Sequence, residues 1–127
     1  MASRTSNFCI DARDPYAQVQ WWAQVLDDFR LDDLDEMTPD DEECWLNGPD
    51  DRELIFVRVP EPKTVKNRMH LCVRPTDRSR EEEVDRLLGL GARMVDDRRT
   101  APDRGWAVLA DPEGNEFCVL TRYQKGA

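Results

Sequence analysis

His70 is the only histidine of the chain, and its imidazole is the side chain best suited to proton transfer near neutral pH. His70, Cys72 and Arg74 alternate along one apolar stretch, and side chains two residues apart on a strand point to the same face. His70 could act there as a catalytic base or hydrogen-bonding group, or it could simply bond to the backbone as a half-buried strand residue. Arg74 could hold a substrate carboxylate or form an ion pair with Asp11.

The cysteines could supply a nucleophile, but their spacing excludes the common short-range motifs. No two of them are close in the sequence, so a zinc ribbon and a redox CxxC motif are excluded; they are Cys9, Cys44, Cys72 and Cys118. We predict that Cys9 and Cys72 are small buried residues and not a disulfide pair. Cys118 could be a thiol nucleophile activated by His70, but we favour an apolar packing role.

Two tryptophans lie on expected strands close to turns and could wall a binding site. Trp45 and Trp106 would present aromatic surfaces to a planar or cationic ligand. The alternative is ordinary packing. Trp22 instead fits the apolar stripe of a helix and is expected in the core.

The first half of the chain reads as a strand, a helix and a hairpin. Asp14 and Pro15 are suited to the N-cap and first position of a helix over residues 16–29, which carries apolar residues at helical spacing. Strands are expected over 8–11, 44–46 and 54–59, the last two joined by a turn over 47–51. The segment 31–43 holds eight acidic residues, and we interpret it as a solvated strand-and-loop region.

The second half repeats this order. We expect a helix over residues 78–90, ended near Gly91, and a turn over 111–115. The expected strands cover 69–73, 93–95, 106–110 and 116–122. Each half thus has a strand, a helix and three strands, which predicts an α+β protein.

An internal repeat supports this division. Residues 7–14 resemble residues 70–77, and residues 46–54 resemble residues 109–117, with one common offset of 63. A shared offset over two separated blocks predicts two copies of one supersecondary unit. We expect one domain over residues 1–127, with module one at about 5–59, a connector over 60–68 and module two at about 69–124.

Composition limits the partners. The net charge of −9 would repel a phosphate backbone, so nucleic acid is excluded as a partner. The acidity serves solubility or, alternatively, attracts a cationic small molecule. No apolar run is long enough to span a membrane, and the first residues lack the apolar core of a signal peptide, so we expect no membrane association and a cytoplasmic location.

The doubled strand-helix-three-strand order, the segment Asp111–Asn115, the pair Trp21-Trp22 and the stretch 58–63 together resemble the vicinal oxygen chelate superfamily, in particular its glyoxalase-like domain branch. This superfamily includes glyoxalase I, extradiol dioxygenases and the bleomycin and fosfomycin resistance proteins. The resemblance implies two tandem βαβββ modules that form a curled mixed-sheet cup with the helices outside, and it implies a homodimer.

The resemblance also implies where a metal would bind. The ligand positions fall on Asn7, Ile55, His70 and Cys118, and only His70 has the residue type that the family uses. Two good ligands do not make a tight site for a divalent metal. We therefore expect no metal and no other cofactor. The resemblance instead assigns ligand-binding positions to Asn7, Cys9, Trp45, Ile55, Cys72, Arg74, Trp106 and Cys118, with His70 as the catalytic candidate.

The function implied by the resemblance is the binding of a small organic molecule without the family-type catalytic metal. One alternative is a lyase or isomerase of glyoxalase type that uses an altered metal site or His70 as base. Another is a drug-binding resistance protein of the bleomycin type. A third is a structural or regulatory module whose cup is filled by side chains.

Overall fold

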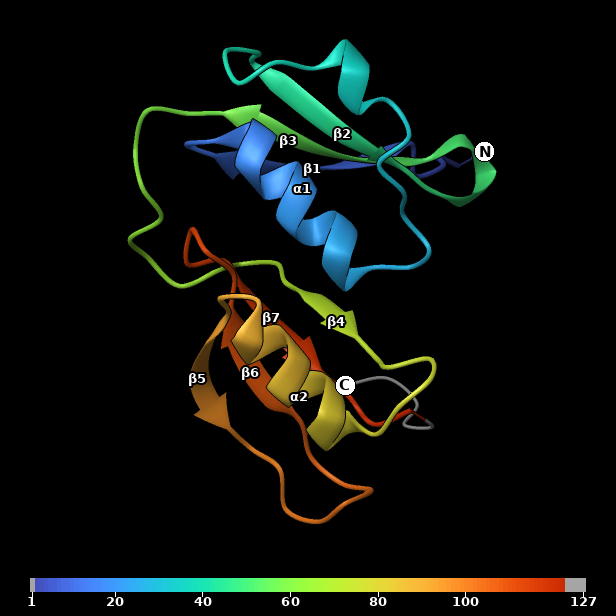
Figure 1. Ribbon diagram of the computed structural model, residues 1–127, viewed down its shortest axis with the longest axis vertical. Helices are drawn as coiled ribbons and strands as arrows, with labels where there is room; N and C mark the ends of the chain where they lie inside the picture. The colour runs from blue at the N-terminus through green and yellow to red at the C-terminus, as the bar shows by residue number, and fades with distance from the viewer. Residues whose placement is uncertain (1, 123–127) are drawn as a thin grey trace. The chain divides into compact units, whose positions relative to one another are not determined.

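The computed structural model describes residues 2–122. The chain divides into two compact units, one ending at Pro62 and the other beginning at Lys63 (Figure 1). No helix within the described residues is both long enough and apolar enough to cross a membrane.

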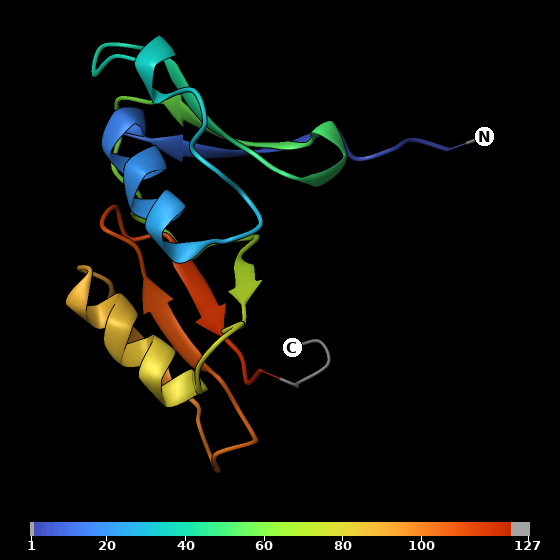
Figure 2. The ribbon, with the colours of Figure 1, turned by 45° about the vertical axis from the view of Figure 1, so that its right-hand side comes forward.

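Unit 1 is a three-stranded mixed sheet with one helix packed on it. Its elements are β1 (Asn7–Ala12), α1 (Pro15–Val25), η1 (Leu34–Glu36), β2 (Glu43–Asn47), η2 (Pro49–Asp51) and β3 (Glu53–Arg58). The strand order is β1-β3-β2, with β1 parallel and β2 antiparallel to β3. The predicted hairpin is therefore confirmed, and α1 packs against β2 and β3 on one face of the sheet (Figure 2).

The helix α1 begins where the sequence predicts but ends earlier. Asp14 is its N-cap, and the carboxylate accepts a hydrogen bond of 3.1 Å from the backbone N–H of Ala17. The prediction that the helix continues to residue 29 is wrong, because Leu26 is extended. The ring of Phe29 lies against Gly48 instead, so close that a Cβ at residue 48 would be 2.4 Å from it. Packing of this ring on the hairpin turn thus replaces the last helical turn.

Unit 2 is a four-stranded mixed sheet with one helix. Its elements are β4 (Leu71–Val73), α2 (Arg80–Gly89), β5 (Arg93–Asp97), β6 (Ala107–Ala110) and β7 (Glu116–Val119). The order is β4-β7-β6-β5, with β4 parallel to β7 and the other pairs antiparallel. A capping box of Ser79 and Glu82 starts α2 two residues later than predicted, and Gly91 at φ 108° follows its end.

The internal repeat is visible in the strand register. Cys9 lies opposite Ile55 in the β1–β3 pair, and Cys72 lies opposite Cys118 in the β4–β7 pair. Both members of the second pair follow their counterparts by the 63 residues of the sequence offset. The α+β class with two tandem modules is therefore confirmed.

The two modules differ in their outermost strand. In unit 2, β5 pairs with β6 from Arg93 opposite Ala110 onward. In unit 1, the equivalent contact is an isolated bridge between Arg30 and Asn47. The acidic segment that follows Arg30 forms the short helix η1 in place of a strand, because closely spaced aspartates favour turns over a sheet edge. Unit 2 has the three predicted strands after its helix, and unit 1 has two.

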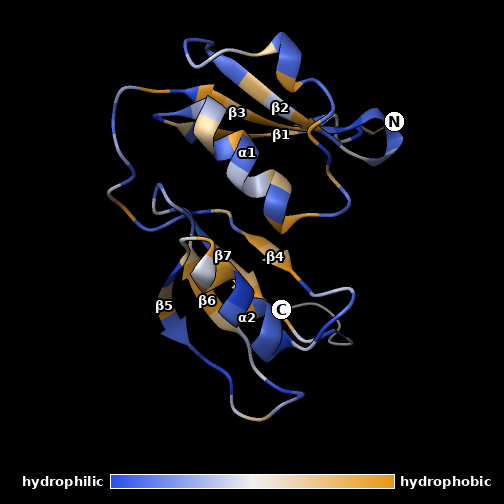
Figure 3. Ribbon diagram, in the orientation of Figure 1, coloured by the Kyte–Doolittle hydropathy of each residue, from blue (hydrophilic) through white to orange (hydrophobic). Residues whose placement is uncertain are grey.

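Each unit has its own apolar core. Trp22 is buried as predicted, and its ring meets that of Trp21 edge to face with centroids 5.2 Å apart. The side chains that fill unit 2 are also fully buried; they are Val84, Leu87, Leu109, Phe117 and Val119. Apolar colour follows β4, β6 and β7, whereas the end of β5, most of α2 and the loops are hydrophilic (Figure 3).

A buried carboxylate holds the turn that starts β7. Asp111 is fully buried and accepts hydrogen bonds from the backbone N–H groups of Glu113 and Asn115, each at 2.9 Å. The side-chain amide of Asn115 donates a third bond of 3.2 Å, and Gly114 has a φ of 92°. The predicted turn over residues 111–115 is confirmed, and it sets the position of the β7 residues that follow.

Candidate functional site

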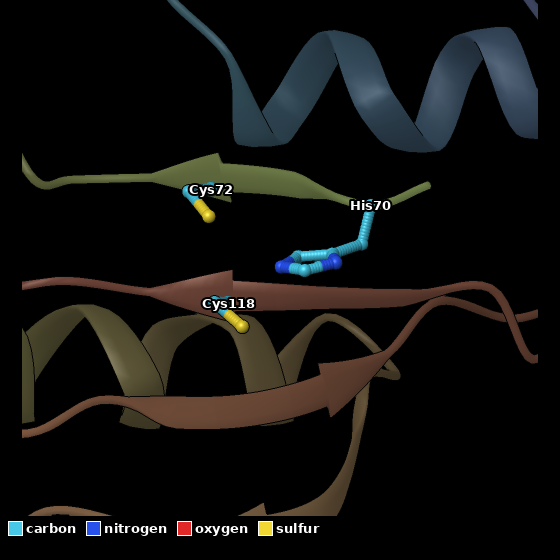
Figure 4. A group of neighbouring side chains, drawn as sticks. All are labelled: His70, Cys72 and Cys118. Carbon is cyan, nitrogen blue, oxygen red and sulfur yellow. The ribbon is translucent and has the colours of Figure 1, made fainter. Parts of the chain in front are cut away.

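A histidine and two cysteines lie together in unit 2. One ligand atom from each of His70, Cys72 and Cys118 lies within 4.8 Å of the other two (Figure 4). Cys72 is on β4, His70 precedes that strand by one residue, and Cys118 is on β7. We call these three residues the His-Cys-Cys cluster.

The parallel pairing of β4 and β7 creates this cluster. Cys72 and Cys118 are register partners, so their side chains leave the same face of the sheet. His70 lies two residues before Cys72, and alternation along the chain puts its side chain on that face as well. The neighbouring residues Phe117 and Val119 point the other way, into the core of unit 2.

The cluster is open to solvent on one side. Cys118 is buried, with 6% of its surface exposed, whereas His70 and Cys72 are exposed. The prediction that Cys72 is buried is therefore wrong, and the same holds for Cys9. Both cysteines lie on the sheet face that carries no helix, so strand alternation turns them away from the core. All four cysteines are free thiols.

Burial keeps Cys118 protonated. Desolvation raises the pKa of this thiol to about 11, and the charge of Cys72 and a side-chain hydrogen bond with Cys72 act in the same direction. The ammonium group of Lys66 opposes this shift. A thiol with such a pKa is a poor nucleophile at neutral pH.

A carboxylate lies beside the cluster. Glu116 forms an ion pair with Lys66, and its backbone N–H donates a 2.9 Å hydrogen bond to the side-chain oxygen of Asn67. The hydrogen bond from Lys66 is the main cause that lowers the pKa of Glu116, and the charge of His70 contributes. Sequence reasoning missed this group as a site. Glu116 could have been found from its place two residues before Cys118, whereas Lys66 and Asn67 lie in the connector, which has no periodic pattern.

Two further predicted residues lie on either side of the line of β7, one directly after β4 and one directly before β6. Val108 on β6 lies opposite Cys118 on β7. If this antiparallel register is continued by two residues, Trp106 lies opposite Leu120. Toward β4, the backbone N–H of Leu120 donates a hydrogen bond to the carbonyl of Val73, the residue before Arg74. Trp106 is half-buried and Arg74 is exposed. Both lie on the opposite side of Cys118 from His70.

The remaining predicted residues form an equivalent group in unit 1. Cys9 and Trp45 both lie opposite Ile55 in the register. The amide of Asn7 donates to the Cys9 sulfur at 3.3 Å, and the indole N–H of Trp45 donates to Asp33 at 2.9 Å. The site residues predicted from the sequence therefore belong to two groups, one in each unit.

Comparison with known proteins agrees with this architecture. The family model of the glyoxalase-like domain matches residues 7–120. The chain belongs to the glyoxalase-like domain family. This family lies within the vicinal oxygen chelate superfamily, so the resemblance seen in the sequence is confirmed.

Solved structures of other members share the fold at low sequence identity. The fosfomycin resistance protein FosX from Mesorhizobium loti is 17% identical, with a TM-score of 0.67, over 98% of this chain and 94% of that chain. A glyoxalase/bleomycin resistance protein/dioxygenase family enzyme from Burkholderia phytofirmans PsJN is 22% identical, with a TM-score of 0.61, over 90% of this chain and 94% of that chain. A possible glyoxalase from Bacillus cereus is 14% identical, with a TM-score of 0.62, over 94% of this chain and 99% of that chain. Comparison with curated proteins found no match.

The residues of this glyoxalase-like protein do not fit a hard divalent metal at the positions that the superfamily implies. Ile55 has a hydrocarbon side chain and cannot ligate. The Asn7 amide donates to Cys9, and Cys118 offers sulfur where a carboxylate is expected. Hard cations prefer oxygen ligands, and among the four positions only the neutral amide of Asn7 offers an oxygen, so the set does not suit them.

Proposed function

We propose that this glyoxalase-like protein binds a small organic molecule on the open face of the unit 2 sheet, without the hard divalent metal of its superfamily. The observation that carries this proposal is the His-Cys-Cys cluster itself, which places the exposed side chains of His70 and Cys72 on the face of the unit 2 sheet opposite α2. Sites for small molecules combine such polar groups with aromatic surface.

The side chains on this face favour a planar ligand with an acidic end. Arg74 is exposed and offers a guanidinium group to a carboxylate or phosphonate, and Trp106 offers an aromatic surface. Arg74 directly follows β4 and Trp106 directly precedes β6, so β7 runs between their strands and separates them by about 10 Å at the usual strand spacing. That span suits a small organic molecule, and His70 would donate a hydrogen bond at the other end of the face.

The experiment is a titration of Trp fluorescence with small carboxylic and phosphonic acids, including fosfomycin, and with bleomycin as a cationic probe. We expect an acidic compound to quench the fluorescence at a saturable site. Loss of a charge-assisted hydrogen bond of about 1.5–3 kcal/mol should weaken binding about 10- to 100-fold in Arg74→Ala. The matched control is Arg30→Ala, since Arg30 is an exposed arginine of unit 1.

The outcomes separate the candidate functions. Quenching by bleomycin alone would replace the acidic ligand with a cationic drug, and an unaltered affinity in Arg74→Ala would remove Arg74 from the site. Turnover of a bound carbonyl compound, lost in His70→Ala, would make the protein a lyase or isomerase that uses His70 as base. Light scattering on the same samples tests the homodimer that the family implies.

A further inference from the structure

We propose that His70, Cys72 and Cys118 form a thiolate-rich zinc site within unit 2, with one coordination position open to solvent. This inference goes beyond the proposed binding function and does not depend on it. It rests on the proximity of three metal-ligating side chains that come from two paired strands and the residue just before one of them.

The distances are close to those that zinc requires. Zinc binds sulfur at about 2.3 Å and nitrogen at about 2.0–2.1 Å, so the ligand atoms of a tetrahedral site lie about 3.7 Å apart. The three ligand atoms here already lie within 4.8 Å of one another. A contraction of at most about 1 Å therefore completes the site, and rotation of the exposed His70 and Cys72 side chains can supply it.

The donor set selects the kind of metal. Two thiols and one imidazole are soft to intermediate donors, which favour zinc and cadmium over magnesium and manganese. His70 and Cys118 occupy two of the four positions that the superfamily implies, whereas Cys72 lies outside them. This site therefore differs from the family metal site by its third ligand and by its sulfur-rich chemistry. Three protein ligands leave a fourth tetrahedral position for water, as in catalytic zinc sites.

The surroundings are compatible with a bound cation. Two thiolates would balance the charge of Zn²⁺, and the chain carries a net charge of −9. The positive charge of Lys66, which acts on Cys118, is already paired with Glu116. The charge of His70 also acts on Glu116, so a carboxylate lies within electrostatic range of a ligand histidine.

Unit 1 provides an internal comparison. The residues equivalent to the cluster are Asn7, Cys9 and Ile55, which precede it by 63 positions. Only Cys9 among them offers a sulfur or imidazole ligand. A thiolate-dependent metal site is therefore expected in unit 2 alone.

The test is a metal titration of the full chain, stripped of metal and kept reduced. Cadmium is the first probe, because cadmium–thiolate bonds give an ultraviolet charge-transfer band. We expect one equivalent of Cd²⁺ to produce this band, Zn²⁺ to displace it, and Mg²⁺ and Mn²⁺ to leave it unchanged. Changing even an outer-shell partner costs about 10- to 100-fold in metal affinity, so Cys72→Ser should cost at least about 100-fold.

Matched variants decide the outcome. Cys9→Ser removes the equivalent exposed thiol of unit 1 and should bind as the parent chain does. His70→Asn introduces the residue found at the equivalent position of unit 1 and should weaken binding as Cys72→Ser does. Because Cys118 is buried, Cys118→Ser is informative only if it melts as the parent chain does, and the two exposed positions carry the test without it.

The proposal would be overturned if the charge-transfer band were absent, or if Cys72→Ser bound cadmium as tightly as the parent chain. It would also be overturned if Cys9→Ser lost as much cadmium affinity as Cys72→Ser. Binding of Mn²⁺ as tight as that of Zn²⁺ would also overturn it, because it would indicate a hard-metal site. The titration uses metal alone, so its result is independent of whether an organic ligand is found.

Discussion

Cys72 and Cys118 lie opposite each other across the parallel strands β4 and β7, where Cys9 and Ile55 lie opposite each other across β1 and β3. The same position of the repeated module therefore holds a pair of thiols in one unit and a thiol with a hydrocarbon in the other. Since His70 in unit 2 corresponds to Asn7 in unit 1, the reactive side chains of this position are concentrated in the second module.

The cysteines should differ in reactivity. Cys72 and Cys9 are exposed, whereas Cys44 and Cys118 are buried and have raised pKa values, that of Cys118 reaching about 11. Alkylation requires the thiolate, so iodoacetamide at neutral pH should label the exposed pair first. Labelling of Cys118 should accelerate as the pH rises toward 11, as measured by peptide mass spectrometry. Equal labelling of Cys72 and Cys118 at neutral pH would contradict this prediction.

The Asp111 carboxylate should contribute strongly to stability. Asp111→Ala removes the carboxylate that accepts from the N–H groups of Glu113 and Asn115, which should lower the free energy of unfolding by about 1–3 kcal/mol. Asp111→Asn keeps one acceptor oxygen and should lower the free energy of unfolding by less than Asp111→Ala does. Urea unfolding measures both, with the exposed Asp103→Ala as control. A loss in Asp111→Ala no larger than that in the control would be inconsistent with this role.

Two glycines should respond in opposite ways to alanine. Gly105 has a φ of 77°, and a Cβ there would lie 2.0 Å from the carbonyl oxygen of Arg98, so Gly105→Ala should be destabilising. A Cβ at Gly89, in α2, would meet no atom within 4 Å. Gly89→Ala should therefore raise the free energy of unfolding by up to about 1 kcal/mol through helix propensity. Melting temperatures that shift in the same direction in both variants would count against this geometry.

The ion pair beside the cluster should make stability depend on pH. Lys66 lowers the pKa of Glu116 in the folded protein. The ion pair therefore contributes to the free energy of unfolding above the pKa that Glu116 has in the unfolded chain, and this contribution is lost as the pH falls through the pKa of the folded state. Lys66→Met should raise the pKa of Glu116 toward its usual value, measured by NMR titration. The variant should lose stability at neutral pH and match the parent chain below the folded pKa. Lys63→Met serves as control, since Lys63 acts on Glu116 only through its charge.

Local patterns in the sequence were sufficient for most of the fold. The offset of 63 predicted two equivalent modules, and the register pairs of Cys9 and Cys72 follow it. Asp14, Gly91 and the turn from Asp111 act through bonds to near neighbours in the chain, so their effects can be read without tertiary structure. The end of α1 could not be predicted from local patterns, because Phe29 packs on Gly48 instead of continuing the helix.

The composition of the site depended on the tertiary structure. Strand alternation places His70 and Cys72 on one face from sequence alone, but Cys118 joins them only because β7 pairs in parallel with β4 in that register. Exposure of Cys9 and Cys72 was likewise decided by which sheet face the helices cover. A strand pattern determines which residues share a face, whereas contacts between distant segments determine which face meets solvent and which side chains meet one another.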